Sequence, residues 1–344
     1  MAHPLSTVVL TPAEIAKAAE ILRTDRLLAF PTETVYGLGA NALSPLAVEK
    51  IFVAKQRPHW DPLIVHIADL SQLAGIAEVS PLAQRLIDRF WPGPLTLLLH
   101  RMPAVPDAVT AGRPLVGVRI PRHPLALALL REAGVPIAAP SANRFGHTSP
   151  TTAAHVLADL DGRIDAVLDG GPTEVGVEST VAEVTGDGVT IYRPGAVTLE
   201  MIESVTGPGT VRFYEPGQGR AVPVESLPSP GVGIRHYAPR ATLKLIEVPH
   251  FRLAGLEDSL LQAIGDALPT GKKVGVMLPD GWSVDGRAEL YPWGSWSQQA
   301  VLAQRLFSGL RALDDAGAEI ILCPVPTGPG LAAALRDRLG KAAR

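Results

Sequence analysis

Two cations leave the end of one predicted helix, and their spacing suits the binding of phosphate. The helix begins at Ser44 and Pro45 and reaches Lys55, and Arg57 follows after one intervening residue. Pro58 then forces an extended path, because a proline cannot continue a helix. A lysine supplies a point charge and an arginine a planar fork of donors, so the pair can neutralise a phosphate chain. Cations at a helix C-terminus also complement the helix dipole, so both interpretations stay open.

A second polar group, Ser141 and Asn143, follows a short predicted strand at 135–139. In α/β proteins the carboxyl ends of strands carry ligand-binding groups, and a hydroxyl and an amide can bind phosphate or ribose oxygens. Turn formation is the competing interpretation, because serine and asparagine are common turn residues. Ser149 is ambiguous in the same way, since it also stands where a helix is capped.

Two further polar residues lie in apolar strands. Arg119 belongs to a β-rich run at 115–120, where an unpaired charge costs several kcal/mol. Arg119 therefore requires a carboxylate, from a ligand or from the protein itself. His66 ends the predicted strand at 63–67, and a lone histidine there is more often structural. The nine histidines show no metal-binding spacing, so we expect no metal ligated by the protein.

Residues 37–42 read G-x-G-x-x-A and suggest a dinucleotide fingerprint. That fingerprint needs its first glycine at the end of a strand and a helix directly after it. Here the predicted strand ends at Phe30, a polar loop follows through Gly39, and the next helix starts only at Pro45. The spacing therefore disfavours a nicotinamide oxidoreductase, and the P-loop signature G-x-x-x-x-G-K-[ST] is missing from the sequence.

These residues stand in an alternation of short helices and strands that predicts a mixed α/β sheet with helices on its faces. The expected strands are 27–30, 63–67, 95–100, 115–120, 135–139, 166–168, 179–184 and 189–193. Glycine and proline supply 12 of the 34 residues at 207–240, where we expect no regular structure. We predict a domain at 1–207, a linker at 208–240 and a smaller Rossmann-like α/β domain at 241–344.

The composition restricts the class of protein. The chain has 344 residues, 47% hydrophobic and 19% charged, which is typical of a globular protein of two domains. A formal net charge of -3 and 5% aromatic residues argue against wholesale nucleic-acid binding. The lone Cys323 excludes an intramolecular disulfide. Because no signal sequence and no apolar run of about 18 residues is present, we expect a cytoplasmic protein without a membrane segment.

Several segments together closely resemble the YrdC/Sua5 family. They are 31–38 (PTETVYGL), 55–58 (KQRP), 62–66 (PLIVH), 91–96 (WPGPLT), 141–143 (SAN), 178–181 (ESTV) and 193–195 (RPG). Their order and spacing make the resemblance specific over residues 10–207. The segment 229–239 and the second domain resemble the longer Sua5 type of this family.

The resemblance implies L-threonylcarbamoyladenylate synthase activity, a nucleotidyl transfer. Such enzymes join L-threonine, bicarbonate and ATP, and they release pyrophosphate. Their product passes to the transferase machinery that forms N6-threonylcarbamoyladenosine at position 37 of tRNA. The resemblance also implies Mg²⁺ held mainly by the ATP phosphates. We expect any direct contact with tRNA to be weak. An RNA-binding module of the same fold is the alternative, which the acidic balance of the chain disfavours.

The resemblance assigns the candidate site residues to two groups. The nucleotide-binding group is Lys55, Arg57, Asp61, Ser141, Asn143, Ser149, Arg193, His236 and Tyr237. The threonine-binding group is Thr32, Thr34, Tyr36, His66, Arg119, Ser179 and Thr180. Lys55 and Arg57 are the expected catalytic residues, because they would neutralise the phosphates, and Arg119 would hold the threonine carboxylate.

The linker carries one further expectation. Residues 229–239 are too rich in glycine and proline to hold structure alone. A simple linker would nevertheless have no need of the charged and aromatic side chains of Arg235, His236 and Tyr237. Closing lids exclude water and complete a site, and a carbamate needs protection from hydrolysis. We therefore expect this segment to fold over the first domain as a lid, with His236 or Tyr237 near the nucleotide phosphates.

Overall fold

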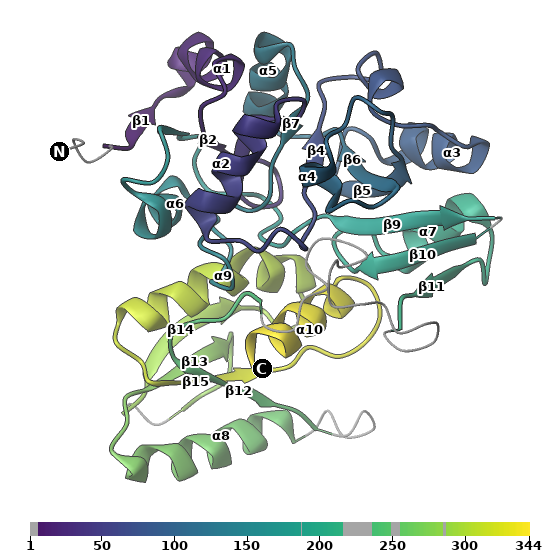
Figure 1. Ribbon diagram of the computed structural model, residues 1–344. Helices are drawn as coiled ribbons and strands as arrows, with labels where there is room; N and C mark the ends of the chain where they lie inside the picture. The colour runs from purple at the N-terminus through teal and green to yellow at the C-terminus, as the bar shows by residue number, and fades with distance from the viewer. Residues whose placement is uncertain (1–5, 187, 216–235, 249–254, 285–286) are drawn as a thin grey trace. The chain divides into compact units, whose positions relative to one another are not determined.

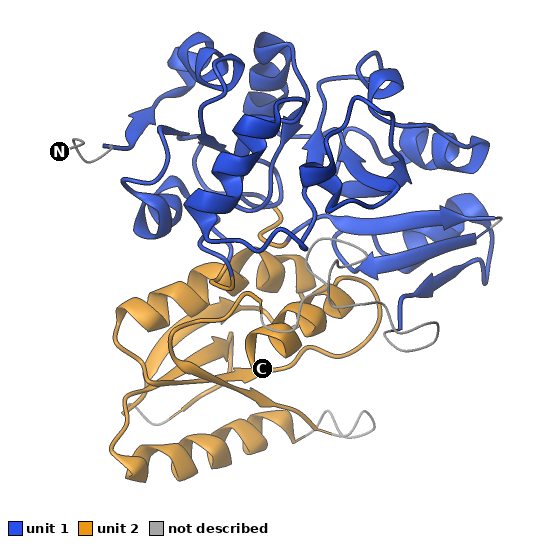
Figure 2. Cartoon of the chain, viewed as in Figure 1, with its two compact units in different colours: residues 1–145, 149–174, 178–233 blue, residues 146–148, 175–177, 234–344 orange. Residues whose placement is uncertain are grey.

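The computed structural model describes residues 6–186, 188–215, 236–248, 255–284 and 287–344 (Figure 1). The chain divides into two compact units (Figure 2). Unit 1 comprises residues 1–145, 149–174 and 178–233, and unit 2 comprises 146–148, 175–177 and 234–344. Most of the predicted linker and of the predicted lid, residues 216–235, lies outside the described residues.

Within the described residues, unit 1 is built on one eleven-stranded sheet that mixes parallel and antiparallel pairs. In spatial order its strands are β1 (Val8–Leu10), β8 (Ala166–Leu168), β2 (Leu28–Phe30), β3 (Gly37–Asn41), β7 (Ile137–Ala138), β4 (Ile64–His66), β6 (Leu115–Arg119), β5 (Leu95–His100), β9 (Thr180–Thr185), β10 (Gly188–Arg193) and β11 (Val211–Phe213). The prediction of a mixed α/β sheet is confirmed.

Helices cover both faces of this sheet. They are α1 (Ile15–Arg23), α2 (Pro45–Lys55), α3 (Pro81–Phe90), α4 (Asp107–Thr110), α5 (Pro124–Ala133), α6 (Ala153–Leu160) and α7 (Leu199–Thr206). Leu28 and Phe30 belong to the core under α1 and α5, whereas Ala29 belongs to the core under α2, α3 and α6. This alternation along β2 follows from the two-residue period of a strand, which sends successive side chains to opposite faces.

The segment expected as a glycine-containing loop is a strand. Gly37–Asn41 forms β3, antiparallel to both β2 and β7. The loop prediction was wrong at this point because two glycines and an asparagine are poor strand formers. The glycines fit for a steric reason: a Cβ at Gly39 would lie 2.9 Å from Ile137 and 2.9 Å from Phe30. Because these glycines lie within a strand and no helix directly follows them, they do not form the dinucleotide fingerprint, which the spacing in the sequence already disfavoured.

The segment 207–240, where we expected no regular structure, contains one strand among its described residues. β11 begins four residues after Gly207 and pairs parallel with β10, with Val211 opposite Val189. A sheet edge offers unpaired backbone groups to any neighbouring extended segment, and β11 satisfies those of β10. The strands β1 (Val8–Leu10) and β14 (Glu289–Gly294) were likewise not expected from the sequence.

Unit 2 is a smaller α/β unit, as expected. Its four described strands are parallel and run in the order β12 (Thr242–Ile246), β15 (Ile320–Pro324), β13 (Val274–Pro279) and β14 (Glu289–Gly294). Its helices are α8 (Leu256–Ala267), α9 (Gln299–Asp315) and α10 (Leu331–Ala342). Helix α8 lies between β12 and β13 in the chain and α9 between β14 and β15, and parallel strands connected in this way give the Rossmann-like pattern. Among the described residues of both units, no helix has the length and apolarity needed to cross a membrane.

The close approach at Gly39 yields a stability prediction. Gly39→Ala should lower the free energy of unfolding by about 1–3 kcal/mol, because the added methyl group overpacks the space between Phe30 and Ile137. Gly75→Ala is the matched control, since a Cβ at Gly75 would meet nothing within 4 Å. Urea unfolding of the two variants would measure the difference. Equal midpoints for both would contradict the steric explanation.

Candidate active site

The end of α2 brings Lys55 to the segment that carries Ser141 and Asn143. The Lys55 side chain is 1% exposed, and its Nζ donates to the backbone oxygen of Ser141 at 2.6 Å and to that of Asn143. The backbone N–H of Phe145 donates to the backbone oxygen of Lys55 at 2.9 Å. The structure thus joins three of the predicted nucleotide-binding residues through one ammonium group.

The surroundings of the Lys55 ammonium group shift its pKa. Burial holds the pKa of Lys55 well below its usual range, and the positive charge of Arg57 lowers it further. Nearby Asp159 and Asp61 act in the opposite direction. An approaching phosphate would favour the charged form, because an opposite charge within about 4–6 Å stabilises it. An anionic group beside Lys55 would therefore raise its pKa again.

Arg57 is held in place by a set of contacts to its own loop. Its Nε donates to the backbone oxygen of Asp61 at 3.0 Å, and its Nη2 donates to that of Pro62 at 2.8 Å. The same Nη2 lies 2.8 Å from the Asp61 carboxylate, and both side chains are almost fully buried. The guanidinium carbon also lies 6.0 Å from the centre of the Phe145 ring. Asp61 is thus the counter-ion that makes the buried Arg57 tolerable.

Arg119 meets the carboxylate that its burial requires within the protein. Its Nη2 lies 2.6 Å from Glu33 Oε1, and its Nη1 donates to Thr34 Oγ1 at 3.2 Å. Thr34 Oγ1 in turn lies 2.8 Å from Thr32 Oγ1. Glu33 was not among the predicted site residues. The signal that could have found it is its position directly before Thr34, since Arg119 already required an acid.

His66 lies beside this pair. In the parallel pairing of β4 and β6, His66 is opposite Arg119, and its ring meets the Phe30 ring edge-on at 6.1 Å. Burial and the charge of Arg119 lower the pKa of His66 to about 3. The imidazole is therefore neutral at physiological pH.

The two predicted groups of residues meet at Ser179 and Arg193. Arg193 Nε donates to the backbone oxygen of Ser179 at 3.0 Å, and its Nη2 donates to Ser179 Oγ at 3.1 Å. Ser179 Oγ lies 2.8 Å from Thr96 Oγ1. Burial lowers the pKa of Arg119, and the charge of Arg193 lowers it further, whereas Glu33 acts in the opposite direction. One predicted nucleotide residue is thus bonded to one predicted threonine residue.

The remaining predicted residues of unit 1 have contacts of their own. Ser149 Oγ donates to Glu178, and both residues are buried. Thr180 Oγ1 donates to the backbone oxygen of Val197 at 2.6 Å. The hydroxyl of Tyr36, the residue before β3, donates to the backbone oxygen of Gly171 at 2.7 Å. The ligand roles of Ser149, Thr180 and Tyr36 stay predictions.

His236 and Tyr237 belong to unit 2. Tyr237 is 1% exposed and has a left-handed backbone with φ of 65°. The Arg338 guanidinium lies 5.3 Å from the centre of its ring, and the Phe307 ring packs at 5.6 Å. The backbone N–H of His236 donates to the backbone oxygen of Lys341 at 3.4 Å. Their expected position at the nucleotide stays a prediction.

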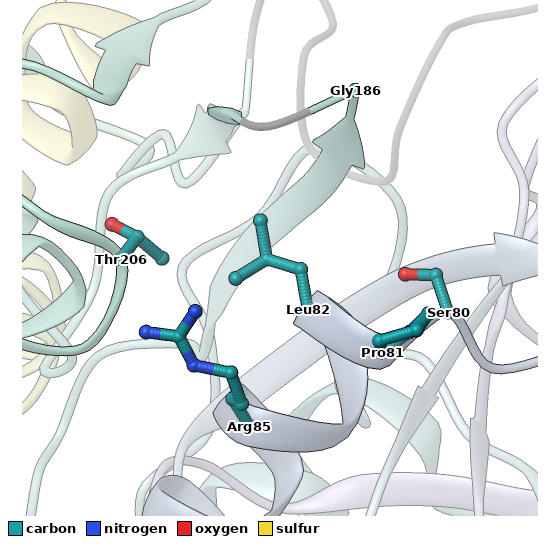
Figure 3. Close-up of a pocket in the computed structure, with 6 residues that line it drawn as sticks. All are labelled: Ser80, Pro81, Leu82, Arg85, Gly186 and Thr206. Atoms are coloured by element: carbon teal, nitrogen blue, oxygen red, sulfur yellow. The ribbon is translucent and has the colours of Figure 1, made fainter.

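One cavity of unit 1 contains none of the predicted site residues. It measures about 400 Å³ and is lined by Ser80, Pro81, Leu82, Arg85, Gly186 and Thr206 (Figure 3). Arg85 Nη2 donates to the backbone oxygen of Val205, so its charge already serves the packing of α3 against α7. We do not assign the candidate site to this cavity.

Comparison with known proteins places these features in a family. Residues 20–195 match the family described as Telomere recombination, and residues 197–344 match Threonylcarbamoyl-AMP synthase, C-terminal domain. The threonylcarbamoyl-AMP synthase of Bacillus subtilis is 44% identical over 341 residues, which is 96% of this chain and 93% of that protein. The chain belongs to the threonylcarbamoyl-AMP synthase family.

Other members of the threonylcarbamoyl-AMP synthase family match along both units. That of Pyrococcus abyssi is 42% identical, over 96% of this chain and 94% of its own length. The crystal structure of P. abyssi Sua5 complexed with L-threonine superposes with a TM-score of 0.89 at 41% identity, covering 98% of each chain. The resemblance to the long Sua5 type is thus confirmed. The full-length matches support an enzyme over an RNA-binding module.

The buried pair of Arg57 and Asp61 yields a prediction. Asp61→Ala should lower the free energy of unfolding by about 3–5 kcal/mol, because it removes the carboxylate that compensates a buried arginine. Glu174→Ala removes the partner of the exposed Arg122 and should change stability by less than about 1 kcal/mol. Thermal and urea unfolding would compare the two variants. A similar loss in both would refute the dependence on burial.

Proposed function

We propose that this chain catalyses the reaction of its family, the synthesis of threonylcarbamoyl-AMP from L-threonine, bicarbonate and ATP. The observation that supports it best is the bonding of Arg193 to Ser179. It joins a residue of the predicted nucleotide group to one of the predicted threonine group. The relatives that carry this enzyme name match over almost the whole chain. A threonine site is further supported by the P. abyssi relative, which was crystallised as a complex with L-threonine.

The reaction has two bond-forming steps. The threonine ammonium group first loses a proton, and the resulting amine bonds to the carbon of bicarbonate, which gives a carbamate and a water molecule. A carbamate oxygen then attacks the α-phosphorus of ATP, and the bond from that phosphorus to the β-phosphate bridge breaks as pyrophosphate leaves. Phosphoryl and nucleotidyl transfer depend chiefly on positioning and charge neutralisation. Lys55 and Arg57 are the buried cations that would neutralise the phosphates.

Magnesium is part of the proposal as an ion carried with the nucleotide. In the described part of the chain, no group of three or more His, Cys, Asp or Glu side chains could hold a metal ion. The donor set thus fits an ion coordinated mainly by phosphate oxygens and water, as Mg²⁺ prefers. When bound, it would add positive charge beside Lys55 and Arg57.

The destination of the product is a proposal of the same kind. A mixed anhydride of AMP is reactive towards amines, so a second enzyme must transfer the threonylcarbamoyl group to an acceptor. We propose that the acceptor is the N6 amine of adenosine 37 in tRNA, reached through the transferase machinery, and that the reaction occurs in the cytoplasm. The formal net charge of -3 offers no support for tight tRNA binding by this chain.

The role of Lys55 can be tested with the reaction itself. Purified protein should release pyrophosphate from ATP only when threonine and bicarbonate are both present, and Lys55→Ala should slow this release at least about tenfold. Lys50→Ala is the matched control, because Lys50 stands on the same helix but is exposed. Circular dichroism would verify that both variants are folded. Wild-type release from Lys55→Ala would remove this residue from the mechanism.

The proposed threonine site predicts an order of substrates. A site that hydrogen-bonds a substrate hydroxyl rejects an analogue without it by more than an apolar pocket rejects a lost methyl group. Serine should therefore be a poorer substrate than threonine, and 2-aminobutyrate poorer still. Initial rates of pyrophosphate release would rank the three. Equal rates with threonine and 2-aminobutyrate would show that no polar group reads the hydroxyl.

A further inference from the structure

The buried pair of Glu33 and Arg119 uses only part of its hydrogen-bonding capacity. Glu33 Oε1 and Arg119 Nη2 face each other at 2.6 Å, with the two side chains 1% and 3% exposed. The second carboxylate oxygen, Glu33 Oε2, has no hydrogen-bond partner among the described residues, and neither has Arg119 Nε. Buried polar atoms are nearly always bonded, so two such atoms in one ion pair require an explanation.

The two atoms are of opposite character. Oε2 belongs to a carboxylate and can only accept hydrogen bonds, whereas Nε–H belongs to a guanidinium and can only donate. A partner that satisfies both must offer a donor and an acceptor a few bonds apart. An α-amino acid is such a partner, because its ammonium group carries the donors and its carboxylate the acceptors.

A purely structural role explains only half of this geometry. Glu33 Oε1 alone supplies the counter-charge that the buried Arg119 needs, and Thr34 Oγ1 accepts from its Nη1. The remaining oxygen would then be buried without compensation, which is costly for a charged group. A ligand that bonds to this oxygen in the functional state removes that cost.

The neighbours of the pair favour the same ligand. His66, opposite Arg119 in the sheet, is neutral, because burial and Arg119 lower its pKa to about 3. It therefore adds no second positive charge that would compete for Glu33. Thr32 and Thr34 add hydroxyl groups beside the pair. The surroundings thus offer the carboxylate of Glu33 and the guanidinium of Arg119 together with neutral polar groups, and the charge of Arg193 also acts on Arg119.

We infer that Glu33 binds the α-ammonium group of threonine through Oε2, while its Oε1 orients Arg119 towards the threonine carboxylate. This rests on the proposed function and adds a substrate-binding residue to it. The contact outlasts the first chemical step, because the carbamate nitrogen keeps one N–H that can donate to Glu33. Without this acceptor the threonine ammonium group would have no charged partner in the described part of the site.

The test compares two ligands that differ at one group. L-Threonine carries an ammonium group where 2,3-dihydroxybutyrate carries a hydroxyl, and both keep the carboxylate. Calorimetry on the full chain should show the dihydroxy acid binding about thirtyfold or more weakly to the wild type, since a charge-assisted hydrogen bond is lost. Similar affinities of the two ligands for the wild type would overturn the inference, whatever any variant does.

The variant Glu33→Gln separates direct contact from a structural role. It should weaken threonine binding at least about tenfold and leave binding of the dihydroxy acid within about threefold, because only the first ligand has an ammonium group. A role exerted only through Arg119 would weaken both ligands equally, and that result would also overturn the inference. If this variant loses ATP affinity, Glu33→Asp keeps the charge on a shorter side chain and allows the same comparison.

Failure of the inference and failure of the proposed function give different results. If the wild type releases pyrophosphate only with threonine and bicarbonate, yet binds both ligands alike, the function stands and Glu33 has no direct role. If the wild type releases no threonine-dependent pyrophosphate, the proposed function itself is wrong.

Discussion

The free-energy cost of removing cations from water determines which groups surround them in the interior of unit 1. Lys55, Arg57, Arg119 and Arg193 are all 6% exposed or less, and a buried charge is tolerated only where partners replace its hydration. Each of the four has oxygen partners. Lys55 donates to two backbone carbonyls, and Arg57 lies against the carboxylate of Asp61. Arg119 lies against the carboxylate of Glu33, and Arg193 donates to the backbone and hydroxyl oxygens of Ser179. These cations fix the loops on which the polar residues stand. Carboxylates of the protein compensate Arg57 and Arg119, whereas uncharged oxygens accept from Lys55 and Arg193.

Local signals were enough to predict most elements of the fold. Pro45, Pro81 and Pro124 stand at the first position of α2, α3 and α5, where a missing N–H costs nothing. The apolar run 95–100 coincides with β5. Elements that depend on distant partners were missed. β3 contains glycines that only the nearby Phe30 and Ile137 explain, and β11 exists because β10 offers it an open edge.

In the candidate site, too, local features could be predicted from the sequence and distant partners could not. The need of Arg119 for a carboxylate follows from its apolar strand, but the identity of that carboxylate does not, since Glu33 lies 86 positions away along the chain. The resemblance of short segments to a known family assigned residues to ligands without giving their contacts. The structure supplies those contacts, and it shows that Asp61 and Tyr36 already have partners in the protein. Burial and sheet register, which decide such pairings, are properties of the folded chain.

The division of the chain into units has a consequence for dissecting it. Residues 146–148 count with unit 2, although they stand between Asn143 and Ser149 in the sequence. The backbone oxygen of Gly146 accepts from the N–H of Ala238 at 2.8 Å, and that of Thr148 accepts from Arg311. A chain shortened after residue 207 would keep these two carbonyl groups and lose both donors. A single cut between the two units would therefore leave these backbone carbonyl groups without their donors, in the loop between the candidate nucleotide-binding residues Asn143 and Ser149. The activity of a shortened chain would thus reflect the disturbed loop as well as the missing unit.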